Sequence, residues 1–232
     1  MSDRESQKRR AAERAVELVQ DGMKLGLGTG STARHVLHAL AARRARGELP
    51  DIVGVATSNA TEQEAIALGI PIRPLNDLLT LDLGIDGADE VDACLDVIKG
   101  LGGALLWEKI VAYCCREFVV VADESKLVER LGLVAPLPVE VVQFGWKTHL
   151  DAMREFRSQA QLRVLSGGEP FVTDGGHYIL DCRFENGIPE PGDVDTAVRN
   201  RPGVVETGLF VDIVKKVIVA GPDDVRILER QP

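Results

Sequence analysis

Short apolar segments that alternate with helix-like segments constrain the fold of this chain more than any other feature. Each apolar segment has the length of a strand buried on both faces, and most are followed by a polar motif and a helical pattern. This alternation predicts βαβ units, and hence an α/β fold with a mostly parallel, Rossmann-like sheet and helices on both faces. We expect strands at 24–28, 51–57, 81–85 and 117–122, and helices at 4–20, 31–46, 59–69 and 103–116.

The pattern changes after Pro136 and Pro138. The order strand, helix, two strands, helix that follows is typical of a compact α+β unit of the ferredoxin-like kind. We therefore predict a smaller subdomain at 137–206, inserted into an α/β domain made of 1–136 and 207–232 that carries the candidate catalytic residues. The expected elements are 139–142, 146–160, 162–165, 177–184 and 192–200, and the apolar segment 214–221 is expected to rejoin the first sheet.

The composition excludes several classes of protein. The 232 residues include 27 Lys and Arg against 36 Asp and Glu, which gives a net charge of −9. A nucleic-acid-binding surface needs a basic face, so no nucleic-acid partner is expected. No apolar segment reaches the ~20 residues of a membrane span, and the N-terminal segment lacks the apolar core of a signal peptide. We expect a cytoplasmic protein without membrane contact, with reduced and mostly buried thiols at Cys94, Cys114, Cys115 and Cys182.

A first glycine loop, residues 26–32 with the sequence GLGTGST, follows a predicted strand and opens a predicted helix. It lacks the third glycine of a dinucleotide-binding fingerprint, where Ser31 stands, and it lacks the lysine of a Walker A loop. Free backbone N–H groups and two hydroxyls at the start of a helix are nevertheless the groups that bind a phosphate. The alternative is a glycine turn in which Ser31 or Thr32 caps the helix.

Three carboxylates lie within five residues in the motif Asp86-Gly87-Ala88-Asp89-Glu90, directly after a predicted strand. Asp86 and Asp89 can serve as an acid, a base or acceptors for substrate hydroxyls. Asp and Glu oxygens also suit Mg²⁺, and a solvated acidic turn is a further alternative.

A second glycine loop, residues 99–103 with the sequence KGLGG, leads into the helix that carries Glu108. Lys99 can oppose a developing negative charge, and the glycines let the backbone approach a substrate closely. Neighbouring apolar side chains are expected to desolvate Glu108 and raise its pKa towards neutral, as a general base requires. The alternative is a surface charge beside Lys109. The apolar neighbours are Leu105, Leu106, Trp107 and Ile110.

Other polar residues carry weaker signals. Lys126 follows the strand at 117–122 and can reach a phosphate. His35 and His38 have the spacing that a metal tolerates on a helix, but no further ligand is placed to complete a set, so no metal is expected. His149 and His177 are isolated in the sequence.

Taken together, the motifs GTGST, TSNAT, DGADEVD, KGLGGALLWEK, VVVADESK, LPVEV and FVTDGGHYILDC resemble those of the type A ribose-5-phosphate isomerase family. The resemblance runs from about Lys8 to about Ala220. It implies an aldose–ketose isomerase of the pentose phosphate pathway that interconverts ribose 5-phosphate and ribulose 5-phosphate. It also implies a sugar-phosphate ligand and a homo-oligomer, either a dimer or a tetramer. No metal and no cofactor are expected, because neither a complete metal-ligand set nor a dinucleotide-binding fingerprint is found in the sequence.

The resemblance assigns roles to residues of this chain. It implies Glu108 as the general base that moves a proton through an enediolate, Lys99 as the group opposing the negative charge, and Asp86 and Asp89 as further catalytic groups. The implied substrate-binding residues are Lys8, Thr29, Gly30, Ser31, Thr32, Gly87, Ala88, Gly100, Leu101, Gly102 and Lys126.

Three positions depart from the family pattern. Leu101 stands where Gly or Arg is usual, Trp107 where a polar or basic residue is common, and His177 where Asn is usual. Two alternative functions remain at this point. A non-catalytic sugar-phosphate sensor would need the phosphate-binding loop but not Glu108, and a coenzyme-A transferase-like enzyme would use a glutamate as its nucleophile.

Overall fold

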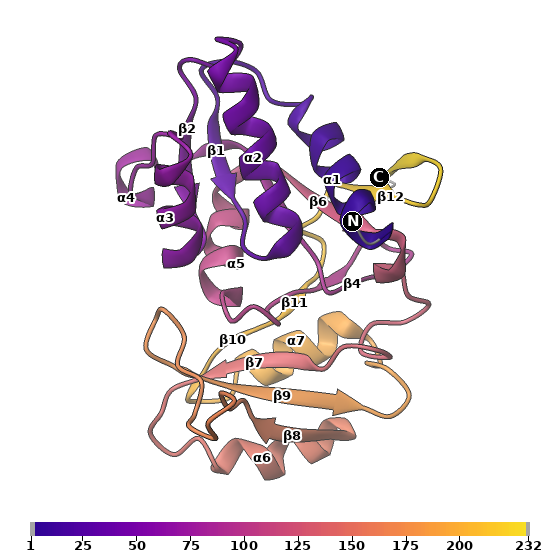
Figure 1. Ribbon diagram of the computed structural model, residues 1–232. Coiled ribbons are helices and arrows are strands. Elements are labelled where there is room, and N and C mark those ends of the chain that lie inside the picture. The colour runs from indigo at the N-terminus through magenta and orange to yellow at the C-terminus, as the bar shows by residue number, and fades with distance from the viewer. Residues whose placement is uncertain (1–2, 231–232) are drawn as a thin grey trace. The chain divides into compact units, whose positions relative to one another are not determined.

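The computed structural model describes residues 3–230 (Figure 1). By their internal contacts these residues divide into two compact units. The first unit comprises 3–88, 107–126 and 212–230, and the second comprises 89–106 and 127–211. The predicted boundaries of an inserted folding domain at 137–206 stay a prediction, because compactness alone does not show that a segment folds independently.

A six-stranded sheet with the order β13-β12-β6-β3-β1-β2 forms the centre of the first unit. The five strands from β12 to β2 are parallel, and only the edge strand β13 is antiparallel to its neighbour. The predicted α/β fold with a mostly parallel sheet is therefore confirmed, as is the return of segment 214–221 to this sheet. The strands are β1 (Lys24–Leu27), β2 (Val53–Ala56), β3 (Leu81–Gly87), β6 (Cys115–Asp123), β12 (Lys216–Ala220) and β13 (Val225–Glu229).

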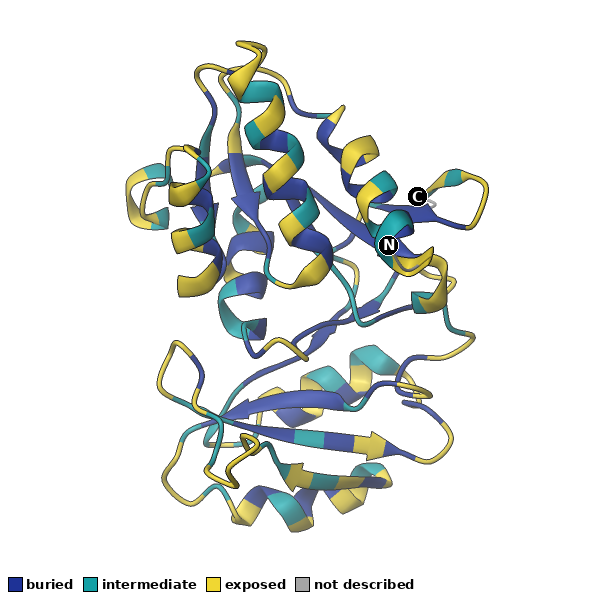
Figure 2. Cartoon of the chain, viewed as in Figure 1, coloured by how far each residue is buried: buried dark blue, intermediate teal, exposed yellow. Residues whose placement is uncertain are grey.

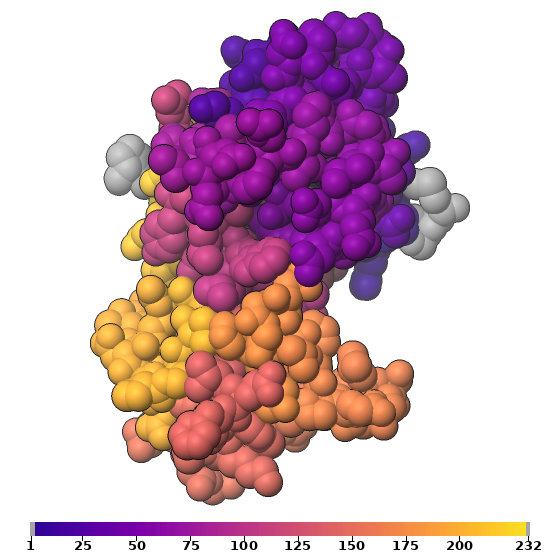
Figure 3. Space-filling view, turned by 90° about the vertical axis from the view of Figure 1, so that its left-hand side faces the viewer, coloured from indigo at the N-terminus to yellow at the C-terminus, as the bar shows by residue number. Residues whose placement is uncertain are grey.

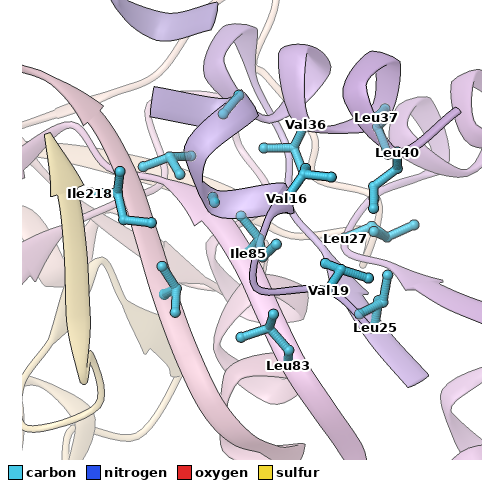
Figure 4. Packing of buried hydrophobic residues seen from close by; sticks show 14 of the residues in the cluster. Val16, Val19, Leu25, Leu27, Val36, Leu37, Leu40, Leu83, Ile85 and Ile218 are labelled. Carbon is cyan, nitrogen blue, oxygen red and sulfur yellow. The ribbon is translucent and has the colours of Figure 1, made fainter. Parts of the chain in front are cut away.

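Helices cover both faces of this sheet. On one face, α1 and α2 pack against each other and bury a cluster that includes Val16, Leu37 and Ile85 (Figure 4). On the other face, a Cβ atom at Gly26 would lie 2.6 Å from Val111 Cγ1 of α5, so a glycine here lets the helix approach the strand closely. The helices are α1 (Asp3–Val16), α2 (Ser31–Ala45), α3 (Asn59–Ala67), α4 (Leu75–Leu78), α5 (Leu105–Cys114) and the 3₁₀ turn η1 (Glu124–Lys126).

The second unit contains a four-stranded antiparallel sheet with the order β10-β7-β9-β8. Strands and helices follow one another as βαββαβ, so the predicted ferredoxin-like topology is confirmed. Its elements are β7 (Leu137–Val141), α6 (Thr148–Ala152), η2 (Met153–Phe156), β8 (Ser158–Leu162), β9 (Tyr178–Phe184), α7 (Pro191–Arg199) and β10 (Val204–Thr207). A smaller sheet joins β4 (Glu90–Val91), β5 (Val97–Ile98) and β11 (Leu209–Phe210).

Burial follows the sequence pattern in both units. Strands are mostly buried, whereas helices expose one side (Figure 2). In the space-filling view the segment between β8 and β9, drawn in orange, forms a large part of the visible face of the second unit (Figure 3). Within residues 3–230 no helix is long and apolar enough to cross a bilayer.

The helix predicted at 146–160 is present but shorter, and the strand predicted at 162–165 is misplaced. The helical segment ends at Phe156, where Arg157 adopts a left-handed φ of 58°. Ser158–Leu162 instead forms β8, because its side chains alternate in burial with the period of two that a strand requires. The helix predicted at 4–20 also ends early, at Val16.

Candidate active site

The first glycine loop and the Asp86 motif meet at the point where the strand order of the main sheet reverses. β1 lies between β2 and β3, so the loops that follow β1 and β3 leave neighbouring strand ends. Such a switch point is where open α/β sheets bind their ligands. Here the Thr29 N–H donates to Asp86 Oδ1 at 3.0 Å, and the Gly87 N–H donates to the same oxygen at 2.7 Å.

Asp86 is buried, with 1% of its surface exposed, so the alternative of a solvated acidic turn is wrong for this residue. A Cβ atom at Gly28 would lie 2.0 Å from Asp86 Oδ1, which explains why glycine stands there. Gly87 and Ala88, which follow, are half-buried.

Four hydroxyls form a cluster behind the first glycine loop. Thr29 Oγ1 lies 2.8 Å from Thr57 Oγ1, 2.9 Å from Ser58 Oγ and 3.0 Å from Thr61 Oγ1. Ser58 also caps α3 by accepting the Thr61 N–H at 3.1 Å. The sequence offered only the polar motif TSNAT at a strand end as a signal for this cluster, and the residues that follow β2 were not among the predicted site residues.

Lys8 lies against the start of α2. The N-cap of α2 is Gly30, with φ of 106°, so the alternative in which Ser31 or Thr32 caps the helix is wrong. Ser31 Oγ instead accepts a hydrogen bond of 3.0 Å from Lys8 Nζ. The amino group of Lys8 and the positive end of the helix dipole therefore both lie at the start of α2, where together they favour the binding of an anion.

Glu5 supports Lys8 from the other side. Its Oε1 accepts a 2.7 Å bond from Lys8 Nζ, and its Oε2 lies 3.0 Å from His35 Nε2. Hydrogen bonds from Lys8 first and His35 second hold the pKa of Glu5 below its usual value. Sequence reasoning missed Glu5 because nothing but the three-residue spacing on α1 connects it to Lys8.

Glu90 is not available as a metal ligand. It is 1% exposed, and its two oxygens accept the backbone N–H groups of Gly132, Val134 and Ala135 at 2.5–2.7 Å. The Mg²⁺ alternative for this motif therefore loses its third carboxylate. In the part of the chain that the structure describes, no three Asp, Glu, His or Cys side chains converge to hold a metal.

In the second unit, Asp89 and the second glycine loop lie together. Asp89 Oδ2 accepts the Leu101 N–H at 2.9 Å, and the Asp89 N–H donates to Ile98 O. Gly100 and Gly103 have φ values of 104° and 84°, a left-handed conformation that glycine adopts without strain. Asp89 thus acts on the loop through its carboxylate, which the sequence did not indicate.

Lys99 is 2% exposed, and its Nζ lies 5.6 Å from the centroid of the Phe210 ring. Its backbone N–H donates to Gly208 O at 2.9 Å. Gly100 is buried as well, whereas Leu101 and Gly102 are exposed. Leu101, which departs from the family pattern, therefore places its side chain on the surface, while its backbone N–H still donates to Asp89.

Arg163 contacts the second glycine loop, and no sequence signal pointed to it. Its Nη1 donates to Gly100 O at 2.9 Å and to Leu101 O at 3.1 Å. The other guanidinium nitrogens bond to Asp181, with Nε lying 3.0 Å from Asp181 Oδ2.

Glu108 lies in α5 and is 3% exposed, and Lys109 beside it is 2% exposed, so the alternative of a surface charge pair is wrong. Of the predicted apolar neighbours, Leu105 is fully buried but Ile110 is 45% exposed. Burial of Glu108 thus comes from its place on the inner face of α5 rather than from all four neighbours. Lys126 is half-buried in η1, at the carboxyl end of β6.

The histidines that are isolated in the sequence have partners in the second unit. His177 Nδ1 lies 2.9 Å from Oε1 of the buried Glu140, which also accepts a bond from Thr173. Arg201 donates to His149 Nδ1 at 3.1 Å, and burial together with Arg201 lowers the pKa of His149. His177, one of the three departures from the family pattern, therefore forms a polar cluster with Glu140 and Thr173.

All four cysteines are free thiols, as expected, but the prediction that they are mostly buried is wrong. Cys94 is exposed, Cys114 and Cys115 are half-buried, and Cys182 is buried. Burial raises the pKa of Cys115 to about 12, which keeps this thiol protonated and unreactive at neutral pH.

Comparison with known proteins gives one consistent result. Residues 53–224 match the family described as ribose 5-phosphate isomerase A (phosphoriboisomerase A). Ribose-5-phosphate isomerase A of Roseiflexus castenholzii is 50% identical over 222 residues, which cover 96% of this chain and 94% of that protein. Its counterpart from Deinococcus radiodurans is 45% identical over 228 residues, covering 98% and 100%.

Solved structures agree with this result. The ribose 5-phosphate isomerase from Plasmodium falciparum matches with a TM-score of 0.95 at 35% identity, over 98% of this chain and 100% of that chain. A D-ribose-5-phosphate isomerase in complex with phospho-erythronic acid also matches with a TM-score of 0.95, at 41% identity, over 98% and 99%.

Proposed function

Because this chain belongs to the ribose 5-phosphate isomerase A family, we propose that it catalyses the family's reaction with the residues of the two glycine loops, Asp86 and Glu108. The resemblance seen in the motifs is confirmed. The chain is an aldose–ketose isomerase that interconverts ribose 5-phosphate and ribulose 5-phosphate, and the sensor and coenzyme-A transferase alternatives have no support.

Glu108 moves the proton. Starting from the open-chain aldose, its carboxylate takes the proton from C2, which leaves a planar enediolate. The same carboxyl group then delivers a proton to C1, while the hydroxyl proton of O2 passes to O1. One base serves both carbons because they lie side by side in the planar intermediate. The burial of Glu108, at 3% exposed, is the observation that supports this role most strongly, since a desolvated carboxylate is a stronger base.

Lys99 opposes the negative charge that develops on O1 and O2. It is an ammonium group with 2% exposure, in a loop that also presents backbone N–H groups. Such preorganised donors in a desolvated site contribute the largest electrostatic part of many enzymatic rate enhancements. Asp86 or Asp89 assists ring opening and orients the sugar hydroxyls, and Gly87, Ala88, Gly100, Leu101 and Gly102 approach the substrate through their backbones.

The first glycine loop holds the phosphate. Thr29, Gly30, Ser31 and Thr32 surround the start of α2, and Lys8 already lies 3.0 Å from the Ser31 hydroxyl. Lys126 supplies a second cation. Binding energy from the phosphate, which does not react, positions the carbons that do. On this basis unphosphorylated ribose is a very poor substrate.

We also propose a cytoplasmic homo-oligomer, a dimer or tetramer, that turns over without metal or cofactor. Light scattering after gel filtration tests the oligomeric state. Activity that is unchanged after exhaustive chelation supports the metal-free mechanism, and activity that is lost and then restored by Mg²⁺ contradicts it.

The decisive experiment replaces Glu108 with Gln, which keeps the shape and removes the base. We expect kcat to fall by ~10²–10⁴, the usual contribution of general base catalysis. Exchange of the C2 proton of ribose 5-phosphate with D₂O should be lost while substrate still binds. Glu13→Gln, on the exposed side of α1, is the matched control and should exchange at the wild-type rate. If Glu108→Gln exchanged the C2 proton at the wild-type rate, Glu108 would not be the general base, and Asp86 or Asp89 would take that role.

A further inference from the structure

One guanidinium group holds two consecutive carbonyl groups of the second glycine loop. Arg163 Nη1 donates to Gly100 O at 2.9 Å and to Leu101 O at 3.1 Å, more than sixty positions away along the chain. These carbonyls belong to the two residues that directly follow Lys99. The contact therefore lies on the loop that the proposed mechanism uses to stabilise the enediolate.

Arg163 is itself fixed from several sides. Its side chain is 12% exposed and forms a two-pronged ion pair with Asp181, in which Nε lies 3.0 Å from Oδ2. The guanidinium carbon lies 5.8 Å from the centroid of the Phe171 ring. The backbone of Arg163 is tied too, since its N–H donates to Ile179 O at 2.8 Å and its carbonyl accepts the Phe171 N–H at 2.9 Å. An arginine with so many partners has little freedom to leave the loop.

The geometry of the peptide group gives this contact a consequence. In a trans peptide the C=O and N–H bonds point in opposite directions, and the described residues contain no cis peptide. When Arg163 holds Gly100 O and Leu101 O, the N–H groups of Leu101 and Gly102 must point away from the guanidinium. The Leu101 N–H shows this directly, because it donates to Asp89 Oδ2 at 2.9 Å. The Gly102 N–H lies on the next peptide, at an exposed residue.

The charge on Arg163 adds to the effect of its position. A cation that binds a carbonyl oxygen polarises the whole peptide group and makes its N–H a stronger donor. Because Asp181 pairs with the guanidinium, the free-energy penalty of burying this charge is smaller than it would be for an unpaired charge.

We propose that Arg163 is a positioning residue for catalysis, which fixes and polarises the Gly100–Gly102 backbone so that the Gly102 N–H and Lys99 together face the enediolate oxygens. This inference rests on the proposed role of the second glycine loop. Asp181 supports it by orienting Arg163, and Asp89 holds the same loop from the opposite side.

Two variants test the proposal. Arg163→Lys keeps the charge, but a single ammonium cannot reproduce a fork that serves Asp181 and two carbonyls at once. Asp181→Asn keeps Arg163 and removes the partner that orients it. Since misplacement of a catalytic group by about 1 Å can cost ~10²-fold, we expect kcat to fall 10- to 100-fold in Arg163→Lys and less in Asp181→Asn. KM should stay within about threefold, because phosphate binding is left intact. Arg183→Lys, at an exposed arginine on the adjacent strand β9, is the matched control and should keep wild-type kcat.

Hydrogen exchange and stability distinguish a positioning role from a purely structural role. If Arg163 positions the loop, hydrogen exchange of the peptide that covers residues 98–106 should accelerate in Arg163→Lys, while the unfolding midpoint and exchange in the β1–β3 region stay near wild type. A lower midpoint with wild-type kcat in the folded variant would overturn the proposal. If Arg163→Lys fails to fold, Asp181→Asn decides alone, and a wild-type kcat in that variant also overturns it.

Lys99→Met separates this proposal from the proposed function. If Lys99→Met keeps wild-type kcat, the role assigned to the second glycine loop is wrong and the inference about Arg163 falls with it. If Lys99→Met loses kcat but both Arg163→Lys and Asp181→Asn do not, the loop is catalytic and only the role of Arg163 is wrong. If all three lose kcat, the double variant Lys99→Met/Arg163→Lys should lose less than the product of the single losses, because the residues act through one loop. Independent, multiplying losses would overturn the coupling.

Discussion

The two glycine loops of this enzyme look alike in sequence but are held in different ways. The first, residues 26–32, is fixed by groups at neighbouring strand ends of one parallel sheet, such as Asp86 and Thr57. The second, residues 99–103, is fixed by remote groups of the second unit, such as Arg163 and Gly208. The first loop thus inherits its geometry from the sheet, whereas the second depends on individual side chains.

This difference matches a difference in what each loop is proposed to bind. The phosphate has the same charge in the substrate and in the transition state, so the first loop binds both almost equally. The negative charge on O1 and O2 exists only during the reaction, so the second loop should stabilise the transition state selectively. Interactions of the first kind set KM, and those of the second kind set kcat. Variants of Lys99 and Lys8 test this separation, and variants of Thr61 and Glu5 test how the first loop is held.

Among variants that compare the two loops, the largest effect is expected for Lys99→Met. Removal of the ammonium group should lower kcat by ~10²–10³, as for the loss of one oxyanion donor, with little change in KM. Steady-state kinetics in both reaction directions measure the two constants. Lys24→Met, at an exposed lysine that begins β1, serves as the control. A large rise in KM with unchanged kcat would mean that the two loops do not differ in the proposed way.

Lys8→Met should have the opposite signature. Loss of a charge-assisted hydrogen bond to the phosphate costs about 1.5–3 kcal/mol, which corresponds to a ~10- to 100-fold rise in KM. We expect kcat to change much less. The same variant should barely affect the slow turnover of unphosphorylated ribose, which has no phosphate to bind. Equal losses on both sugars would contradict the assignment of Lys8 to the phosphate.

Thr61→Val should have a smaller effect on the first loop. The valine keeps the shape but removes one member of the hydroxyl cluster around Thr29 and leaves its partners short of a hydrogen bond. We expect a loss of ~1–3 kcal/mol in the free energy of unfolding and a severalfold rise in KM. Thr61→Ser should restore both values, since it returns the hydroxyl. Denaturant unfolding and kinetics on the same preparations check the two effects together.

The smallest effect concerns Glu5 and pH. Because the pKa of Glu5 is lowered from 4.5 in the folded protein, its ion pair contributes stability above about that pH and loses it as the pH falls through the folded value. The pair is solvent-screened, so Glu5→Gln should cost no more than about 0.5 kcal/mol at pH 7. The difference from wild type should vanish in acid and shrink at high salt. A difference in stability between Glu5→Gln and wild type that grows as the pH falls would contradict the lowered pKa of Glu5.

The first glycine loop is also the part of the site that the sequence predicts well. Strand and helix signals are local, and the carboxyl ends of neighbouring parallel strands must meet at one edge of the sheet. The proximity of Thr29 and Asp86 follows from this rule alone. The rule does not supply the choice of hydrogen bonds, so it predicts neither the bond from Lys8 to Ser31 nor the bond from Lys8 to Glu5.

The second loop shows where such prediction stops. Arg163 and Asp181 carry no local pattern that distinguishes them from other charged residues near a strand, because their role depends on pairing between β8 and β9. The same pairing decides that Ser158–Leu162 is a strand, although its sequence also continues a helical pattern. Long-range contacts thus override local preference at this point of the chain.

The place of β12 in the main sheet has a consequence for how the protein is made. β6 lies between β3 and β12, and its central residues Phe118–Ala122 are almost fully buried. During synthesis the entire segment 127–211 emerges before Lys216–Ala220 can pair with β6. Until then an apolar strand edge is open to other chains, which is a condition for aggregation. Arg10 of α1 then holds the end of β12 by donating to the carbonyls of Gly221 and Pro222, which directly follow that strand. The edge of β6 that pairs with β12 is therefore exposed until residues 216–220 have been synthesised.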